Sequence, residues 1–113
     1  MLFRSRLNDP HCAFFIALNG AGVPIGQVRC DVSGSVAVIS ISLDPRFRGS
    51  GYGTKLIRRG SETLFERDNV DSIHAFIRRE NDASRRAFEK AGFKKVEDTL
   101  VRGQAASLLV LRK

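Results

Sequence analysis

A glycine-rich turn divides the chain into a half patterned for strands and a half that begins with a helix. Gly49, Gly51 and Gly53 fall within five residues, shortly after the Asp44-Pro45 pair. Before this turn, apolar and polar residues tend to alternate with the period of two typical of strands; after it they recur with the period of about 3.6 typical of helices. The sequence therefore predicts a strand, a tight turn and a helix in this order.

Three strands are predicted before the turn, joined by short segments rich in Asn, Ser and Gly. They cover residues 13–18, 25–32 and 36–43. Hairpin-linked neighbours of this kind form an antiparallel meander. In the third strand one face is apolar throughout, and we expect it to point into the core. This face carries Ala37, Ile39, Ile41 and Leu43.

The second half predicts an amphipathic helix, a strand, a second helix and two closing strands. These elements cover residues 53–67, 72–78, 83–91, 93–96 and 107–111. Asn81 or Asp82 is expected to cap the second helix, and Gly92 to end it. A helical crossover usually joins parallel strands. The expected fold is a mixed α/β sheet, mostly antiparallel with one parallel pair and flanking helices.

Charge indicates an anionic partner. The chain has 113 residues, enough for one domain, and carries 19 Lys and Arg against 12 Asp and Glu, a net charge of +7. Fourteen of the 19 cations are Arg, whose planar fork binds phosphate oxygens in two places. Nucleic acid, a membrane surface and a phosphorylated small molecule remain open on this evidence.

Several other classes are excluded. Glycines and prolines interrupt the longest uncharged run, residues 10–28, so it is not expected to cross a bilayer. Charged residues also interrupt any signal-peptide core at the start. Cys12 and Cys30 lack the spacing of a zinc site, and no metal is expected. We expect a cytoplasmic protein with reduced thiols.

The turn also has the chemistry of an anion site. Glycines let the backbone approach a ligand closely, and the first N–H groups of a helix lack partners within it. A pyrophosphate fits such a site. The Walker and dinucleotide-binding patterns both fail on spacing. The pattern that fits is R-x-x-G-x-G, at residues 48–53.

On this motif the chain resembles the GNAT superfamily of acyl-CoA N-acyltransferases. A second motif of that family, N-x-x-[AS]-x-x-x-[YF]-x-x-x-G-F, matches residues 81–93 in the expected order. The resemblance covers residues 13–113 and implies one GNAT-like domain, 1–113, with acetyl-CoA as cofactor. By this comparison the chain is expected to lack most of the family's N-terminal strand and helices, and residues 1–7 could be the tail of the second of those helices.

The resemblance assigns cofactor contacts residue by residue. Strand backbone would bind the pantetheine arm, the glycine turn would cradle the pyrophosphate, and the second motif would approach from the opposite side. The residues so assigned are Ile41, Leu43, Arg48, Gly49, Ser50, Gly51, Tyr52, Gly53, Thr54, Asn81 and Ser84. Four cations are candidates for the ribose 3'-phosphate: Arg46, Lys55, Arg85 and Lys90.

The implied reaction is attack of an amine on the thioester carbonyl, with strand N–H groups stabilising the oxyanion. Phe88 stands where many family members have a Tyr that protonates the departing thiolate. Ser84 or a water could replace it. No general base is assigned; the nearest titratable groups are Asp31, Asp44, His74 and Glu80.

Two classes of function remain open from the sequence. The first is an N-acetyltransferase acting on a small-molecule or peptide amine, with a homodimer as one assembly. The second is a non-catalytic module that binds acyl-CoA or, less favoured, nucleic acid. The nucleic-acid reading is less favoured because stacking platforms need exposed aromatics, and the chain has one Tyr and no Trp.

Overall fold

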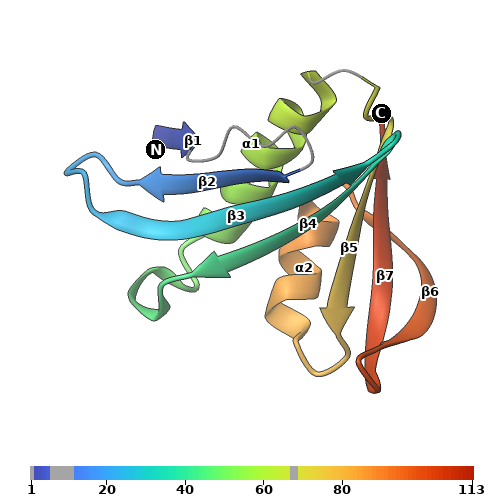
Figure 1. The fold of residues 1–113 in the computed structure, drawn as a ribbon. Coiled ribbons are helices and arrows are strands. Elements are labelled where there is room, and N and C mark those ends of the chain that lie inside the picture. Colours follow the sequence, from blue (N-terminus) through green and yellow to red (C-terminus); the bar gives the residue numbers. More distant parts are fainter. Residues whose placement is uncertain (1, 6–11, 67–68) are drawn as a thin grey trace.

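The computed structural model describes residues 2–5, 12–66 and 69–113. In this part of the chain, seven strands form one sheet and two α helices lie together on one of its faces (Figure 1). The elements are β1 (Leu2–Ser5), β2 (Cys12–Leu18), β3 (Pro24–Ser33), β4 (Val36–Leu43), a 3-10 turn (Pro45–Phe47), α1 (Tyr52–Glu66), β5 (Ser72–Arg78), α2 (Asp82–Lys90), β6 (Lys94–Val101) and β7 (Gln104–Arg112).

The sheet has the mixed topology that the sequence predicts. Its strand order is β1-β2-β3-β4-β5-β7-β6. Only the β4–β5 pair is parallel among the described strands, and the other five pairs are antiparallel. The meander β2-β3-β4, both helices and β5 lie at or within a residue or two of their predicted bounds. β4 and the two helices follow a clear hydrophobic period.

Both ends of the sheet correct the sequence expectation. Residues 2–5 are not the tail of a helix: they form β1, which pairs antiparallel with β2, with Leu2 opposite Leu18. The closing strands β6 and β7 are longer than 93–96 and 107–111. β6 is an edge strand whose side chains are almost all exposed, so no buried face imposes an alternating pattern on its sequence.

The core lies between the sheet and the two helices. Leu56, Ile57 and Leu64 of α1 are fully buried, and Ile39 of β4 is 2% exposed. The expected apolar face of β4 is confirmed, because Ala37 and Ile39 are buried while Ile41 and Leu43 pack against the core from its edge. This close packing fixes α1, and therefore its N-terminus, against the meander.

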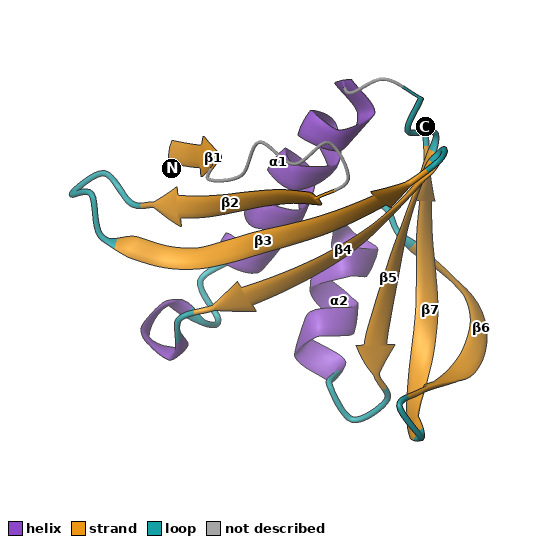
Figure 2. Ribbon diagram, in the orientation of Figure 1, coloured by secondary structure: helices purple, strands orange, loops and turns teal. Residues whose placement is uncertain are grey.

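The sheet opens between its two central strands. β4 and β5 pair only from Val36 to Val38, opposite Ser72 to His74. Beyond this point the register gives residues 39–43 no partner in β5, and the strands diverge with α2 behind the opening (Figure 2). Backbone N–H and C=O groups along this edge of β4 are therefore left for a ligand or for water.

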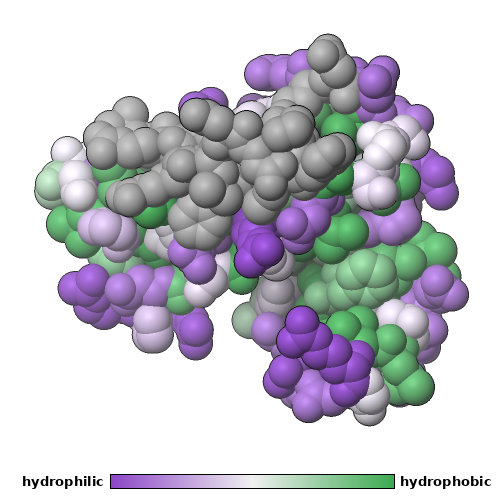
Figure 3. All heavy atoms as spheres, in the orientation of Figure 1, coloured by the Kyte–Doolittle hydropathy of each residue, from purple (hydrophilic) through white to green (hydrophobic). Residues whose placement is uncertain are grey.

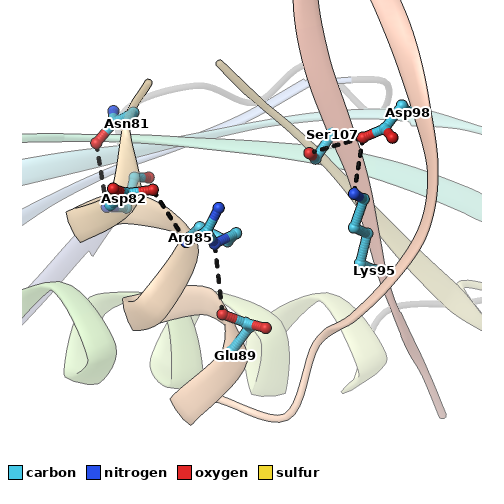
Figure 4. A network of polar contacts seen from close by, with 8 residues as sticks. Asn81, Asp82, Arg85, Glu89, Lys95, Asp98 and Ser107 are labelled. Carbon is cyan, nitrogen blue, oxygen red and sulfur yellow. Dashed lines mark hydrogen bonds and ion pairs between the residues drawn. The ribbon is translucent and has the colours of Figure 1, made fainter. Parts of the chain in front are cut away.

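Asp98 links the edge strand β6 to Ser107 of β7 and to Arg79. This carboxylate lies 2.8 Å from Lys95 Nζ and 3.0 Å from Arg79 Nη2, and the Ser107 hydroxyl donates to it at 3.4 Å (Figure 4 shows the contacts to Lys95 and Ser107). The hydrogen bond from Lys95, together with the charge of Arg79, lowers the pKa of Asp98 below its ordinary value. The carboxylate is therefore charged at neutral pH.

The surface away from the helices has an apolar area over β5 and β7 (Figure 3). Phe76 of β5 is 45% exposed, and Val96 and Leu100 of β6 are also exposed. No helix in the described residues is both long and apolar enough to cross a membrane.

One glycine holds β3 close to the end of β4. A Cβ on Gly26 would lie 2.6 Å from the Ser42 carbonyl oxygen, which is too close for a real contact. We therefore expect Gly26→Ala to lower the free energy of unfolding by about 1–3 kcal/mol, as overpacking typically does. Gly20→Ala is the matched control, since a Cβ there meets nothing within 4 Å. Urea denaturation measures both, and equal stability of the two variants would contradict the close approach.

Candidate cofactor site

A cavity of about 620 Å³ opens where β4 and β5 diverge. It runs from the end of β4 past the glycine turn to the exposed face of α2. It is lined by Ile41, Ser42, Leu43, Arg48, Gly49, Gly51, Gly53, Thr54, Asn81, Ala83, Ser84, Arg86, Ala87 and Lys90. The cavity thus brings together the two motifs that the sequence places about thirty residues apart.

The glycine turn takes a backbone shape that side chains disfavour. Gly49 and Gly51 have φ angles of +78° and +79°, in the left-handed region where only Gly is unstrained. A Cβ on either residue would meet no protein atom within 4 Å. These glycines are therefore required by backbone conformation, and the space in front of them is open to a ligand.

The N-terminus of α1 faces the same cavity. The N–H of Lys55 donates to the Gly51 carbonyl at 3.3 Å, which begins the helical hydrogen bonding, so the N–H groups of the preceding turn have no acceptor within the helix. No acidic residue lies in the first turn to offset the positive end of the helix dipole. Gly53 and Thr54 line the cavity. This end of α1 is suited to an anion.

The charges around the cavity have one sign. Arg48, Arg86 and Lys90 line it, and none of its lining residues is Asp or Glu. The lining also includes the apolar side chains of Ile41, Leu43, Ala83 and Ala87. The site therefore fits a ligand that carries several phosphates and an extended, uncharged arm, which is the chemistry of coenzyme A.

Asn81 has a structural task at the cavity wall. Its side-chain oxygen accepts a hydrogen bond from the Ser84 N–H at 3.1 Å and so caps α2 (Figure 4). The amide nitrogen of Asn81 is left to donate elsewhere, and both residues line the cavity. The expectation that Asn81 caps this helix is confirmed.

Two of the eleven predicted cofactor-binding residues do not line the cavity. Ser50 and Tyr52 belong to the glycine turn but do not line the cavity. The Tyr52 ring packs edge-on against Phe47, with centroids 5.9 Å apart. Nine of the eleven predicted cofactor residues do line it, namely Ile41, Leu43, Arg48, Gly49, Gly51, Gly53, Thr54, Asn81 and Ser84.

The four candidate phosphate-binding cations differ in their surroundings. Arg46 is paired with Asp44, with nitrogen to oxygen distances of 3.2 and 3.1 Å. Arg85 is paired with Asp82 at 2.9 Å and with Glu89 at 3.7 Å. Lys55 lies over the Tyr52 ring. Lys90 alone of the four lines the cavity.

Arg86 also lines the cavity, although sequence reasoning did not select it. It shares a helix face with Ala83, Ala87 and Lys90, which are spaced by three and four residues. This spacing is the signal that could have identified Arg86 from the sequence.

Phe88 lies in the core. Its side chain is 2% exposed and packs edge-on against Phe93, with ring centroids 5.0 Å apart. It has no hydroxyl and does not line the cavity. Ser84 carries the only hydroxyl group of the second motif, and this residue lines the cavity.

A second cavity of about 440 Å³ adjoins the first. The two share Ser42, Leu43 and Arg48. Of the four titratable groups considered from sequence, Asp44 lines this second cavity, whereas Asp31, His74 and Glu80 line neither. Hydrogen bonds from Arg46 lower the pKa of Asp44, so at neutral pH this lining residue is a carboxylate that is ion-paired with Arg46. Among the described residues, no three His, Cys, Asp or Glu side chains group as metal ligands would.

The family model for the acetyltransferase (GNAT) family matches residues 2–93. The chain belongs to this family. Family membership makes acetyl-CoA the cofactor and acetyl transfer to an amine the reaction class. No curated protein sequence matches the chain.

Solved structures agree in fold. The aminoglycoside acetyltransferase AAC(6')-Ib in complex with coenzyme A is 29% identical with a TM-score of 0.82, over 91% of this chain and 67% of that one. Its complex with ribostamycin and coenzyme A is 28% identical with a TM-score of 0.83, over 91% and 65%. The chain thus spans about two thirds of that enzyme. The spermidine N-acetyltransferase SpeG from Vibrio cholerae, 20% identical over 93% of this chain and 68% of that one, shares the fold with a TM-score of 0.82.

The capping bond of Asn81 can be tested by stability. Asn81→Ala removes the acceptor for the Ser84 N–H and should lower the free energy of unfolding by about 1 kcal/mol. Asn81→Ser is the matched control, because a Ser hydroxyl caps a helix almost as well. Chemical denaturation that finds the two variants equally destabilised would show that the cap contributes nothing.

Proposed function

We propose that the chain transfers the acetyl group of acetyl-CoA to a primary amine of a small, positively charged acceptor. In this proposal the first cavity holds the cofactor, the second receives the acceptor, and residues 1–113 act as one domain. The observation that carries the proposal is the wall that the two cavities share at the end of β4. A thioester placed along this wall is accessible to an amine from the other side.

The chain's own groups account for cofactor binding. The N–H groups at the start of α1, with Arg48 beside them, bind the pyrophosphate, since an uncompensated helix N-terminus attracts anions. The pantetheine arm lies between the diverging strands, where its amides can pair with the backbone of residues 39–43 that has no partner in β5. The Asn81 amide nitrogen donates to this arm from the α2 side.

The chemistry follows from these positions. Acetyl-CoA supplies an activated thioester carbonyl, which a neutral amine can attack without a covalent enzyme intermediate. Backbone N–H groups at the end of β4, which have no partner in β5, would donate to the oxygen of this carbonyl as negative charge develops there. The Ser84 hydroxyl would donate a proton to the departing sulfur and regain one from the nitrogen that has attacked, directly or through water, so that the amide and the free thiol form with no net change on the protein; Phe88 cannot take this role.

The acceptor class rests on charge. Asp44 gives the second cavity a carboxylate beside the shared Arg48, and Gln27 and Ser42 add polar groups to its wall. A polyamine or amino sugar with several ammonium groups would be drawn to it. AAC(6')-Ib, with which the chain shares 28–29% identity, has structures with ribostamycin and with kanamycin, which supports a small-molecule amine acceptor.

A non-catalytic acyl-CoA-binding module is the second candidate, favoured by Phe88 at the position of the usual acid. Calorimetric titration with acetyl-CoA, followed by a thiol-release assay against polyamines, aminoglycosides and peptide N-termini, separates the two. Binding with amine-dependent thiol release supports the transferase. Binding without release for any amine supports the module, and no binding at millimolar acetyl-CoA contradicts both.

Asp44 provides a test of the acceptor side. Asp44→Asn keeps a side-chain oxygen for the Arg46 N–H but removes the charge and leaves Arg46 without its ion pair. We expect the KM for a polyamine acceptor to rise about threefold to tenfold, because an attractive charge is lost, with the Kd for acetyl-CoA unchanged.

Asp31→Asn is the matched control for this variant. Asp31 also forms an exposed pair with an arginine, Arg29, at 3.8 Å, yet it lines neither cavity. Steady-state kinetics with both variants measure the effect. An equal change in KM for the two would mean that only the net charge of the protein matters.

A further inference from the structure

We propose that two copies of the chain pair antiparallel along the outer edge of β6, so that their sheets join into one continuous sheet. β6 ends the strand order of the sheet, and in the described part of the chain it pairs with β7 alone (Figure 1). The backbone N–H and C=O groups on its outer edge can therefore bind a further strand. The inference goes beyond the proposed function, because no residue of β6 lines either cavity.

Large apolar side chains are exposed on this strand. Four large hydrophobic residues of the described chain are exposed, and three of them belong to β6: Val96 at 56%, Leu100 at 70% and Val101 at 38%. A single exposed apolar side chain is ordinary on a protein surface, whereas several on one unpaired edge indicate a contact surface.

The charges of β6 are arranged symmetrically about Val96. Two lysines, Lys94 and Lys95, precede this residue, and two carboxylates, Glu97 and Asp98, follow it. A two-fold axis at Val96 reverses the direction of the strand in the second copy, so the lysines of each copy lie beside the carboxylates of the other. Parallel pairing would put lysines beside lysines. The pattern therefore selects an antiparallel pair of identical strands, which closes as a dimer.

Each face of β6 carries one charge of each sign. Opposite residues of an antiparallel pair share a face, so the register with β7 places Lys95 and Asp98 on the face that carries the helices. The same register places Lys94 and Glu97 on the other face. The register shifts between Lys95 and Glu97, which leaves Val96 without a partner in β7. In the proposed dimer each lysine thus lies near a carboxylate of the other copy on its own face.

Lys94 and Glu97 provide the specific part of this contact. Lys95 and Asp98 are already paired with each other at 2.8 Å within one strand. Lys94 and Glu97 are exposed, and neither forms an ion pair among the described side chains. A lysine on an edge strand usually hinders pairing with other strands. A second copy supplies the carboxylate that offsets this charge, so the edge discriminates in favour of its own copy.

Charge reversal at Lys94 and Glu97 tests the contact by sedimentation velocity at chain concentrations up to millimolar. The wild-type chain should show a monomer–dimer equilibrium. Lys94→Glu and Glu97→Lys each set like charges against each other on both sides of the axis, so each should weaken self-association about tenfold. An equimolar mixture of the two variants should dimerise to within about threefold of the wild-type affinity, because every reversed charge then faces its opposite.

Glu80→Lys is the matched control for Glu97→Lys. It makes the same change in net charge at an exposed residue outside β6 and should leave self-association unchanged. Val96→Glu is a second, independent variant, which places two like charges at the axis and should prevent dimerisation while Lys94 and Glu97 are kept. Thermal melting of each variant checks that the fold is kept.

The outcomes are distinct from those of the proposed function. A wild-type chain that stays monomeric at millimolar concentration overturns the inference. A dimer that the three β6 variants leave intact also overturns it, because another surface would then form the contact. Failure of the mixture to restore dimerisation overturns the antiparallel charge pairing. The Kd for acetyl-CoA should be the same in the wild type and the variants, since β6 lines neither cavity.

Discussion

The early end of pairing between β4 and β5 is the constraint on which the site depends. Parallel strands normally satisfy each other's backbone groups along their length, yet here pairing stops after Val38 and His74. The helices keep the strands apart from behind: α1 is anchored by Leu56 and Ile57, and α2 by Phe88, all buried in one core. The polar edge of β4 that results can be satisfied by an extended ligand with amides of its own.

The two cavities beside the opening differ in the charged residues that line them. The cavity on the helix side is lined by cations and the positive end of α1, whereas the adjoining cavity is lined by both Asp44 and Arg48. In the proposed function, an anionic carrier would be attracted to the first cavity, and Asp44 would attract an amine to the other side of the wall at Ser42 and Leu43.

Most of the fold could be predicted from the sequence, because local signals determined it, whereas the cofactor contacts were assigned through the family resemblance. Alternation fixed β4, the Asn81 cap and Gly92 bounded α2, and three glycines marked the turn. The edges could not be predicted so well. β6 has no buried face, and β1 has four residues whose pairing depends on β2.

The sequence was also insufficient to decide which cations line the cavity. The sequence proposed Arg46, Lys55, Arg85 and Lys90 on charge and proximity, but side-chain partners decide which of them is available. Arg85 and Arg86 are adjacent, yet one points to Asp82 and the other lines the cavity. Helical spacing carries this information, whereas charge composition does not. The same applies to Phe88, which the second motif includes but which the core buries.

Hydrogen exchange with and without acetyl-CoA tests the central claim most directly. If the cofactor bridges the opening, amides at residues 39–43 and 49–54 should exchange more slowly when it is bound, because both sets gain acceptors or lose contact with water. Amides of the edge strand β6 should be unaffected. Protection spread evenly over the sheet, or absent from residues 39–43, would contradict a cofactor held between the diverging strands.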